Sequence, residues 1–574
     1  MKSVKRVLAL ALSAALIAGS CVGCSGKGGA SSAANGNTLA SSSAKQKGAV
    51  KNFTTFFAVP LSGAETKDTS EVKAKIAEIT GASAKETWLT GQNCNEAVGM
   101  MIAGGQYPDF LDGSDATPQL LQAGAFVNLD SYIDKYPNIK KYFDKLQWAQ
   151  LKQAEGGHIY YIPQFSTFAG TPSETIHNDE AFWIQTRVLK WAKYPKITTM
   201  DQYFDLIERY LKANPKMQNG AANIGYTILC DDWRYFCLEN APEFLDGYPN
   251  DGSVIVDPNQ KKIIDYNTTP TAKLYFQKLN EEYNKGIVDP ESFTQKYDQY
   301  ISKLSTGRVL GMIDQWWNFY GSVVPAFNTQ KLDKQGCDYV PLPITIRDGV
   351  KNQWHTKDGS VTNVASGIGI TTNCKDVDGA MKFLNDLLSQ DVLILRNWGI
   401  KDRDYTVGSD GLFTRTDEQD DNCNNMTYQA AHLCPYSYFP TYGGKLPDGK
   451  NCVVANRQPA LFEKTLKQDV KDCFAAYGAK NYVDMIGNND KPGDWYPMYT
   501  YSKTLKADTP AGLAWQKIDK SVKHKWLPQV VMAKDFDSEW NSYMSAYNAC
   551  KPQDFVSAMQ TELTNRIKFA QENK

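Results

Sequence analysis

Strand and helix patterns alternate over five segments between residues 51 and 111, and this alternation constrains the fold more than any other feature. The strand-like segments are short and rich in aromatic and β-branched residues, whereas each helix-like segment has an apolar stripe and a glycine stop. The strands are expected at 51–57, 86–89 and 107–111, and the helices at 70–80 and 94–103. This spacing predicts a parallel sheet with crossover helices. Ligands of such sheets bind beyond the carboxyl ends of the strands.

The rest of the chain continues this mixed α/β pattern. Apolar runs at 224–229 and 309–313 predict two further strands, and the glycine-containing run 362–371 predicts an extended crossover between lobes. Helical periodicity is clear at 199–212, 271–285, 376–389 and 553–571. Stretches rich in Gly, Asn and Asp at 404–425 and 443–452 are typical of surface loops. The length of the chain is sufficient for two or more domains with large cores.

The N-terminus has the pattern of an export signal. Lys2, Lys5 and Arg6 form a basic start, and residues 7–17 form an apolar run that is too short to span a bilayer as a helix. No second apolar run approaches membrane-spanning length. The sequence therefore predicts an exported protein that is anchored at a membrane or secreted, and not an integral membrane protein.

Small residues lead from this run to Cys24, and a stretch rich in Ser, Gly and Ala follows it. The arrangement resembles a bacterial lipoprotein signal, in which the cysteine becomes the mature N-terminus and carries the lipid. Cys21 stands where that pattern prefers Leu, and an ordinary secretory signal is the alternative. We expect residues 1–23 to be the signal peptide, Cys24 to be the site of lipid attachment (palmitate), and 24–50 to be a disordered tether.

Charge and aromatic content limit the classes of ligand. The chain has 62 basic and 63 acidic residues, so it lacks the electrostatic footprint of a nucleic-acid-binding protein. It also has 13 Trp, 31 Tyr and 24 Phe, which is more planar surface than a core needs. The composition therefore favours a binding cleft that stacks on a flat or apolar-faced ligand.

Cysteine and histidine give little support to a metal or redox site. Ten cysteines follow the signal region at irregular spacing, so disulfides and buried free thiols are both open. The only CxxC, at residues 21–24, lies in the export signal. The five histidines are scattered, and we expect neither a zinc site nor a cofactor.

Signatures of catalysis are mostly missing from the sequence. It has no GxSxG, HExxH or GxGxxG motif. Residues 444–451 (GKLPDGKN) nearly match a phosphate-binding loop, but Asn451 replaces the Ser or Thr that would hold magnesium, and we interpret the segment as a turn. No pair of carboxylates stands out as the pair of a glycosidase. We therefore expect a protein that is not an enzyme.

Five short segments, in this order, resemble elements of the extracellular solute-binding proteins of family 1, which serve ABC importers for oligosaccharides. The segments are 101–109 (MIAGGQYPD), 160–163 (YYIP), 282–291 (EYNKGIVDPE), 307–312 (GRVLGM) and 398–406 (WGIKDRDYT). Each motif is weak alone, but together they extend the resemblance from about residue 51 to the C-terminus. Some members carry an acidic calcium loop after the helix that starts the second lobe. The corresponding stretch here, 214–223 (NPKMQNGAAN), lacks acidic oxygens, so we expect no metal there.

The resemblance implies an α/β, two-lobed, periplasmic-binding-protein-like fold of type II, with hinge strands and a ligand cleft between the lobes. It implies lobe-one segments at 51–165 and 366–432 and lobe-two segments at 166–365 and 433–574. It also implies a monomer at the outer face of the bacterial cytoplasmic membrane, with ABC permease subunits as its partners. Hinge closure around the ligand would present a distinct face to the permease.

A sugar site needs flat aromatic side chains for the apolar faces of the rings, and hydrogen-bonding groups for the hydroxyls. The segment 314–318 (DQWWN) follows a strand, and it offers Asp314, Trp316 and Trp317; if it is extended, one indole faces the cleft and the other the core. The segment 231–235 also follows a strand, and further candidates come from the first lobe and the family's turn motif. These other candidates are Asp232, Trp233, Arg234, Trp398, Trp88, Gln164 and Asp109, although Asp109 has backbone capping as an alternative role.

These expectations give a membrane-anchored receptor that captures a carbohydrate, most readily an oligosaccharide, and passes it to an ABC importer. Two alternatives stay open. One is the same architecture binding a peptide or another solute, and the other is a surface glycoside hydrolase.

Overall fold

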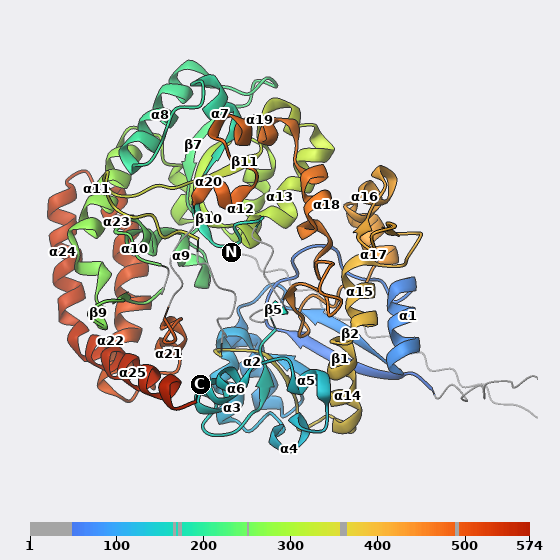
Figure 1. Ribbon diagram of the computed structural model, residues 1–574. Helices are drawn as coiled ribbons and strands as arrows, with labels where there is room; N and C mark the ends of the chain where they lie inside the picture. Colours follow the sequence, from blue (N-terminus) through green and yellow to red (C-terminus); the bar gives the residue numbers. More distant parts are fainter. Residues whose placement is uncertain are drawn as a thin grey trace, which may run out of the picture. The chain divides into compact units, whose positions relative to one another are not determined.

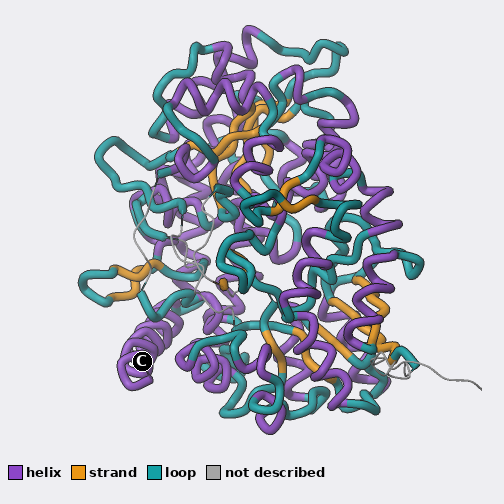
Figure 2. Tube along the Cα trace, turned by 45° about the vertical axis from the view of Figure 1, so that its right-hand side comes forward, coloured by secondary structure: helices purple, strands orange, loops and turns teal. Residues whose placement is uncertain are grey.

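The computed structural model describes residues 49–164, 168–169, 175–249, 252–355, 364–487 and 493–573. The expected lipid-attachment residue Cys24, with the signal peptide and most of the tether, lies outside the described residues. Among the described helices, none has the length and apolar character needed to cross a membrane. The strands gather in two separate sheets with helices around each, and a β-hairpin stands apart from both (Figure 2).

The first sheet has the strand order β2-β1-β3-β12-β4. Strands β1 (Lys51–Phe57), β2 (Ala82–Trp88) and β3 (Phe110–Asp112) are parallel, joined by helices α1 (Glu71–Thr80) and α2 (Cys94–Gly104). This confirms the predicted parallel sheet with crossover helices, although β2 begins earlier than expected. Strands β4 (Tyr161–Ile162) and β12 (Ile368–Ile370) complete the sheet in antiparallel pairing.

Local sequence explains where the first helix begins and ends. The Ser70 side chain accepts a hydrogen bond from the backbone N–H of Lys73, and Gly81 ends α1 with φ of 73°. Val72 and Ile76 are fully buried on the stripe that faces the sheet, with α1 and α14 (Val377–Leu387) lying along it (Figure 1). The predicted amphipathic helix is therefore the element that covers this sheet.

The second sheet has the order β11-β6-β10-β7. Its strands are β6 (Glu180–Gln185), β7 (Ile224–Thr227), β10 (Val309–Gln315) and β11 (Tyr339–Leu342). β7 and β10 are parallel neighbours, whereas β6 runs antiparallel to both β10 and β11. The two strands predicted at 224–229 and 309–313 are thus adjacent, with their carboxyl ends at the same edge of the sheet.

Two large hydrophobic cores accompany the two sheets. The first lobe is the core built from residues 53–162, 368–392 and 434–439, and the second lobe is the core built from 176–354 and 462–550. Cys434, Tyr436 and Phe439 belong to the first core, so the return to the first lobe extends beyond the expected boundary at 432. Ten cysteines among the described residues are buried and unpaired, which favours the interpretation as buried thiols.

The chain passes between the lobes three times. The first crossing joins β4 to β6, the second joins β11 to β12, and the third leads from Phe439 to Phe462. In a small parallel ladder, β15 (Gly443–Gly444) of the third crossing pairs with β5 (Phe168–Ala169) of the first. The first and third crossings are therefore joined by backbone hydrogen bonds.

The remaining elements surround these sheets. The first lobe also contains α3 (Thr117–Gln122), α4 (Asp130–Ile133), α5 (Pro137–Lys140), α6 (Lys145–Ala154), α15 (Gln390–Trp398), α16 (Asp417–Cys423), α17 (Met426–His432), β13 (Thr406–Val407) and β14 (Phe413–Thr414). The second contains α7 (Thr186–Trp191), α8 (Met200–Ala213), α9 (Phe236–Glu239), α10 (Ala241–Leu245), α11 (Pro270–Asn284), α12 (Tyr297–Ser305), α13 (Trp316–Gln330), α18 (Pro459–Thr465), α19 (Gln468–Tyr477), α20 (Tyr482–Ile486), α23 (His524–Met532) and α24 (Phe536–Ala549). A third, smaller core joins the hairpin β8 (Ile255–Asp257) and β9 (Lys262–Ile264) to α21 (Tyr499–Ser502), α22 (Pro510–Gln516) and α25 (Pro552–Asn573).

Candidate ligand-binding site

Two tryptophans meet where the parallel strands β7 and β10 end. Trp233 lies in the turn after β7, and Trp317 lies in the first turn of the helix after β10. Their ring centroids are 5.8 Å apart and their planes differ by 14°, and Phe236 lies 6.0 Å from each. Trp317 is 39% exposed and Trp233 is half-buried. We call Trp233 and Trp317 the indole pair; its two nearly parallel rings give a partly exposed aromatic surface at the edge of the sheet where the strands end.

The adjacent tryptophans Trp316 and Trp317 separate because the chain turns into a helix at this point. An extended segment was expected, but α13 begins at Trp316 itself. Trp316 is only 5% exposed, and it stacks on Tyr320 at 3.7 Å and on Trp183 at 5.2 Å. Trp316 is therefore a core residue that leaves only Trp317 available to a ligand.

Arg234 is held as a flat cation beside the indole pair. Its guanidinium lies 4.4 Å from the Trp233 ring and 4.0 Å from the Tyr297 ring, and its Nε donates a 3.0 Å hydrogen bond to Asn318 Oδ1. Arg234 is 8% exposed, so the stack fixes the direction of its remaining N–H groups. A guanidinium fixed in this way is suited to pair with a hydroxyl or carboxylate in a defined plane.

Asp314 is buried beneath Arg234 and Asn318, and its carboxylate does not reach the surface. Its carboxylate is fully buried and accepts hydrogen bonds from Asn318 Nδ2 at 3.0 and 3.1 Å and from the Tyr300 hydroxyl at 2.7 Å. Burial raises the pKa of Asp314 to about 6, against the opposing effect of these donors. We expected Asp314 to contact the ligand, but it is buried and has a positioning role. It binds the side chain of Asn318, and Asn318 in turn accepts a hydrogen bond from Arg234.

Asp232 is the exposed carboxylate of the same turn. Its backbone has φ of 51°, in the left-handed region that Asp tolerates better than most residues. Partial burial, together with the negative charges of Asp115 and Asp231, raises the pKa of Asp232. The residue is thus an accessible hydrogen-bond acceptor near the indole pair, and its contact with a ligand stays a prediction.

The first lobe brings its own aromatic group to the carboxyl ends of its strands. The sheet register pairs Phe57 with both Trp88 and Asp112, so these residues end three neighbouring strands in one row. Trp88 is half-buried, with its ring 4.6 Å from Phe57 and 4.6 Å from Tyr438. The expected position of Trp88 at the end of the second strand is therefore observed, with Tyr438 beside it.

Gln164 supports Asp112 instead of facing outward. It is 3% exposed, and its Nε2 donates a 2.6 Å hydrogen bond to Asp112 Oδ2. Asp112 also accepts a hydrogen bond from the backbone N–H of Ser114, yet burial raises its pKa to about 6. The hydrogen-bonded residues Gln164 and Asp112 of the first lobe therefore correspond to Asn318 and Asp314 of the second lobe.

Electrostatic effects link the groups of the two lobes. Burial and the charges of Asp112 and Tyr297 raise the pKa of Tyr438 to about 12, and Arg234 opposes this rise. Asp112 and Tyr438 belong to the first lobe, whereas Tyr297 and Arg234 belong to the second. Likewise Asp115 of the first lobe raises the pKa of Asp232 in the second. The two aromatic groups therefore border a common region between the lobes.

Two predicted ligand contacts lie elsewhere. Trp398 is fully buried, where its Nε1 donates a 3.0 Å hydrogen bond to the Cys452 carbonyl, so it offers no ring face to a ligand. Asp109 precedes β3, at the opposite end of that strand from Asp112, and accepts hydrogen bonds from the Thr54 backbone N–H and hydroxyl, both at 2.8 Å. Asp109 thus has the capping role that was its alternative, although its partner is Thr54 of β1 and not its own turn.

The structure adds residues that the sequence analysis did not select: Phe236, Tyr297, Asn318, Asp112 and Tyr438. Asp112 carried a usable signal, because it is the polar last residue of a buried strand. Tyr438 carried none, since it reaches the site only through the fold of the 434–439 segment into the first core.

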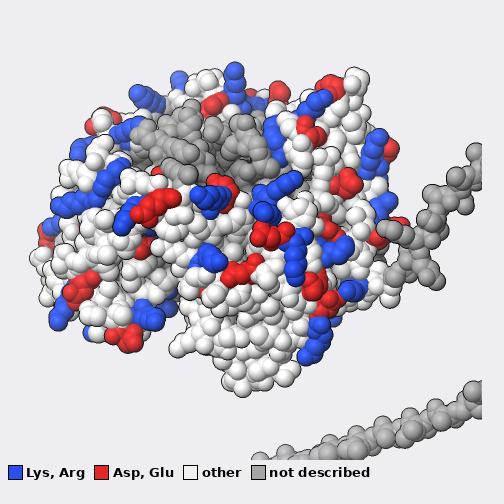
Figure 3. Space-filling view, turned by 60° about the horizontal axis from the view of Figure 1, so that its bottom comes forward, with Lys and Arg blue, Asp and Glu red and all other residues white. Residues whose placement is uncertain are grey.

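One other hollow on the described surface is poor in aromatic side chains. A shallow hollow of about 550 Å³ lies on α23 and α24, but Trp526 is the only aromatic residue among those that line it. Lys and Arg side chains are interspersed with Asp and Glu on the face shown in Figure 3, without a broad region of one sign. This distribution agrees with the nearly balanced charge of the sequence.

Comparison with solved structures shows the same two-lobed α/β fold in several substrate-binding proteins. The Streptococcus pneumoniae ABC-transporter substrate-binding protein FusA (an EF-hand mutant in complex with fructo-nystose) has a TM-score of 0.62 and 17% identity, covering 91% of this chain and all of that one. The alginate-binding protein AlgQ2 without calcium has a TM-score of 0.57 and 16% identity, covering 90% and 98%. An HMO-binding solute-binding protein from Bifidobacterium longum infantis has a TM-score of 0.55 and 15% identity, covering 89% and 98%.

Sequence comparison gives the family. No curated protein sequence matches the chain. The family described as bacterial extracellular solute-binding protein matches residues 90–394, which is more than half of the chain and spans parts of both lobes. With the two-lobed fold and its interlobe aromatic site, the chain belongs to the bacterial extracellular solute-binding proteins.

Proposed function

We propose that this protein captures a carbohydrate, specifically an oligosaccharide, between its two lobes and delivers it unaltered to an ABC importer. The observation that carries the proposal is the indole pair, with planes 14° apart, next to the fixed guanidinium of Arg234. A pyranose ring has an apolar C–H face and a rim of hydroxyls. The indole pair fits the face, and Arg234 and Asp232 fit the rim.

The first lobe supports the same assignment. Trp88 and Tyr438 supply a second aromatic group, whose rings meet edge to face at 4.6 Å and 78°. Two aromatic groups on opposite lobes allow a sugar chain to be held from both sides. Closure is then favoured by contacts that exist only when both lobes touch the ligand.

The structural relatives support a carbohydrate over a peptide. Three of these relatives have names that mention a carbohydrate. FusA is described in complex with fructo-nystose, AlgQ2 as an alginate-binding protein and the Bifidobacterium longum infantis protein as HMO-binding. A peptide would need strand-pairing backbone groups at the site, whereas the groups found here are rings and side-chain hydrogen-bonding groups.

Binding without chemistry fits the family, whose members are binding proteins. The buried carboxyls Asp112 and Asp314 are both engaged in hydrogen bonds that position other side chains. We assign them no catalytic role, and the ligand leaves as it entered.

The family places the protein outside the cytoplasm, and the proposal includes a lipid at Cys24 and a monomer as the binding unit. A long Ser/Gly/Ala-rich segment between the lipid and β1 would let the lobes reach a permease in the same membrane. The partners are therefore an oligosaccharide, the permease subunits and the outer face of the cytoplasmic membrane.

A titration screen tests this function. Oligosaccharides, monosaccharides and short peptides are added to the protein, and the melting temperature and heat of binding are measured. We expect an oligosaccharide to raise the melting temperature with concentration and to be recovered intact after prolonged incubation. A shift with peptides only would contradict the carbohydrate assignment, and shortened products would indicate a hydrolase.

A further inference from the structure

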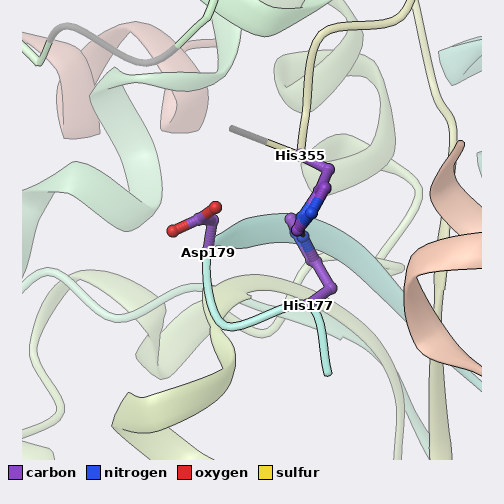
Figure 4. A group of neighbouring side chains, drawn as sticks. All are labelled: His177, Asp179 and His355. Carbon is purple, nitrogen blue, oxygen red and sulfur yellow. Dashed lines mark hydrogen bonds between the residues drawn. The ribbon is translucent and has the colours of Figure 1, made fainter. Parts of the chain in front are cut away.

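Two histidines that are far apart in the sequence meet where the chain crosses between the lobes. His177 lies on the first crossing and His355 on the second, and their Nδ1 atoms are 3.2 Å apart. Asp179 lies beside them, and one donor atom from each of the three residues falls within 4.8 Å of the others (Figure 4). Nitrogen and oxygen donors from two separate segments therefore lie within 4.8 Å of one another, although the Asp179 carboxylate points away from the imidazoles in Figure 4.

The tautomer of His177 is set by a backbone group. Its Nε2–H donates a 2.9 Å hydrogen bond to the Glu180 carbonyl, so its Nδ1 presents a lone pair toward His355. This is the arrangement by which proteins orient histidine ligands, with one ring nitrogen held by a carbonyl and the other directed at the metal. His177 is fully buried, and burial lowers its pKa to about 4, so the ring is neutral near pH 7.

The separation of the two nitrogens suits a tetrahedral ion. Zinc–nitrogen bonds of about 2.0–2.1 Å place two ligand nitrogens about 3.3 Å apart at the tetrahedral angle. The distance between the Nδ1 atoms is 3.2 Å. Without metal, His355 Nδ1–H donates to His177 Nδ1, and a bound ion would replace that single proton.

We propose that His177, His355 and Asp179 form a binding site for a divalent transition-metal ion, with Zn²⁺ as the best match, which joins the first and second crossings. Two imidazoles and a carboxylate favour zinc over calcium or magnesium, which prefer oxygen donors. His177 and His355 are buried, whereas Asp179 is partly exposed, so an ion can enter from its side after a rotation of that carboxylate. Water would occupy the fourth position.

A second cluster, with one histidine and two carboxylates, is less suitable. Glu239, Asp519 and His524 also bring donor atoms together, but the buried Lys523 ammonium lies 2.9 Å from Glu239 Oε2. The Lys523 ammonium therefore already occupies the place near Glu239 that a metal ion would need. At the crossing site, burial lowers the pKa of Arg457, and the negative charge of Asp179 opposes this effect. Arg457 is therefore one side chain with which a metal would compete for Asp179.

The test uses the protein free of affinity tags and titrates it with Co²⁺ and then Zn²⁺. We expect one equivalent of Co²⁺ to give the visible absorption of a tetrahedral site, and Zn²⁺ to displace it. Anomalous diffraction at the zinc edge should place the ion between the two imidazoles. His355→Gln and His177→Gln each remove a proposed direct ligand, so they should weaken zinc binding at least about 100-fold, which is the upper end of what loss of an outer-sphere partner costs.

Two variants keep the test decisive. Asp179→Asn changes a partly exposed side chain, and it should weaken binding about tenfold or more even if a buried histidine variant fails to fold. His158→Gln is the matched control, because His158 is an exposed histidine 2.7 Å from the Asp130 carboxylate; it should leave binding unchanged. The proposal is overturned if the protein binds no stoichiometric metal, if the ion lies elsewhere, or if His355→Gln and Asp179→Asn bind as tightly as wild type.

Discussion

The indole planes of Trp233 and Trp317 lie 14° apart, with their centroids separated by 5.8 Å, although the residues come from loops after different strands. The parallel pairing of β7 and β10 brings these loops together, because it places both strand ends at one edge. The proposed recognition surface is therefore a product of strand order and not of local sequence.

Replacing Trp317 should affect binding far more than folding. Trp317 is 39% exposed, so Trp317→Ala removes less buried area than replacement of a core tryptophan would, but it removes half of the indole pair. We expect a loss of oligosaccharide affinity of about 30-fold, or about 2 kcal/mol, measured by calorimetry. Trp191→Ala is the matched control, since Trp191 is 42% exposed and also packs against one ring, Tyr210. Equal losses in the two variants would argue against the site.

Replacing the neighbouring Trp316 should have the opposite profile. Its side chain fills the core between Tyr320 and Trp183, so Trp316→Ala leaves a large cavity. We expect unfolding in urea to show a loss of about 3–5 kcal/mol in stability. A variant as stable as wild type would mean that the ring is not packed as described.

Asp314 should make stability depend on pH in an unusual direction. Burial raises its pKa from 3.8 to about 6, so the folded protein keeps this proton over a range where the unfolded chain has lost it. The contribution of Asp314 to stability therefore falls as pH rises from about 4 to about 6 and is constant above that range.

Asp314→Asn removes this titration while keeping a neutral side chain of the same shape. Relative to wild type, the variant should gain about 3 kcal/mol in stability between pH 4 and pH 7, measured as the difference between two urea unfolding series. Parallel pH profiles for the two proteins would contradict the raised pKa.

Cys24 should determine whether the protein partitions with membranes. In bacteria that process lipoproteins, Cys24→Ala removes the proposed acyl attachment site, and the protein should move from the detergent phase to the aqueous phase on phase separation. Cys21→Ala is the matched control, because it removes the competing cysteine and should leave the protein in the detergent phase. The reverse result would move the lipid to Cys21.

Much of the fold could be predicted because its signals are local. The strand at residues 51–57 is observed with the same bounds, and Gly81 ends the first helix as expected. Regular alternation of strand and helix then gave the parallel sheet. The end of the segment that returns to the first lobe, near Phe439, could not be located, because nothing in the sequence of residues 434–439 indicates which of the two cores they join.

The site was only partly predictable for a related reason. Trp233 and Trp317 were selected because they follow strand-like runs, and they are partly exposed at the ends of neighbouring strands. The buried positions of Trp316 and Trp398 depend on helix geometry and packing from distant segments. The convergence of His177 and His355 depends on two crossings that are 178 residues apart in the chain. The spacing of His177 and His355 in the sequence therefore does not predict their contact.

The short ladder between Gly443–Gly444 and Phe168–Ala169 has a mechanical consequence. Because these segments share backbone hydrogen bonds, torsion in one is transmitted to the other, and neither can twist alone. Any movement of one lobe against the other would thus act on the first and third crossings together, through the ladder at Gly443 and Gly444.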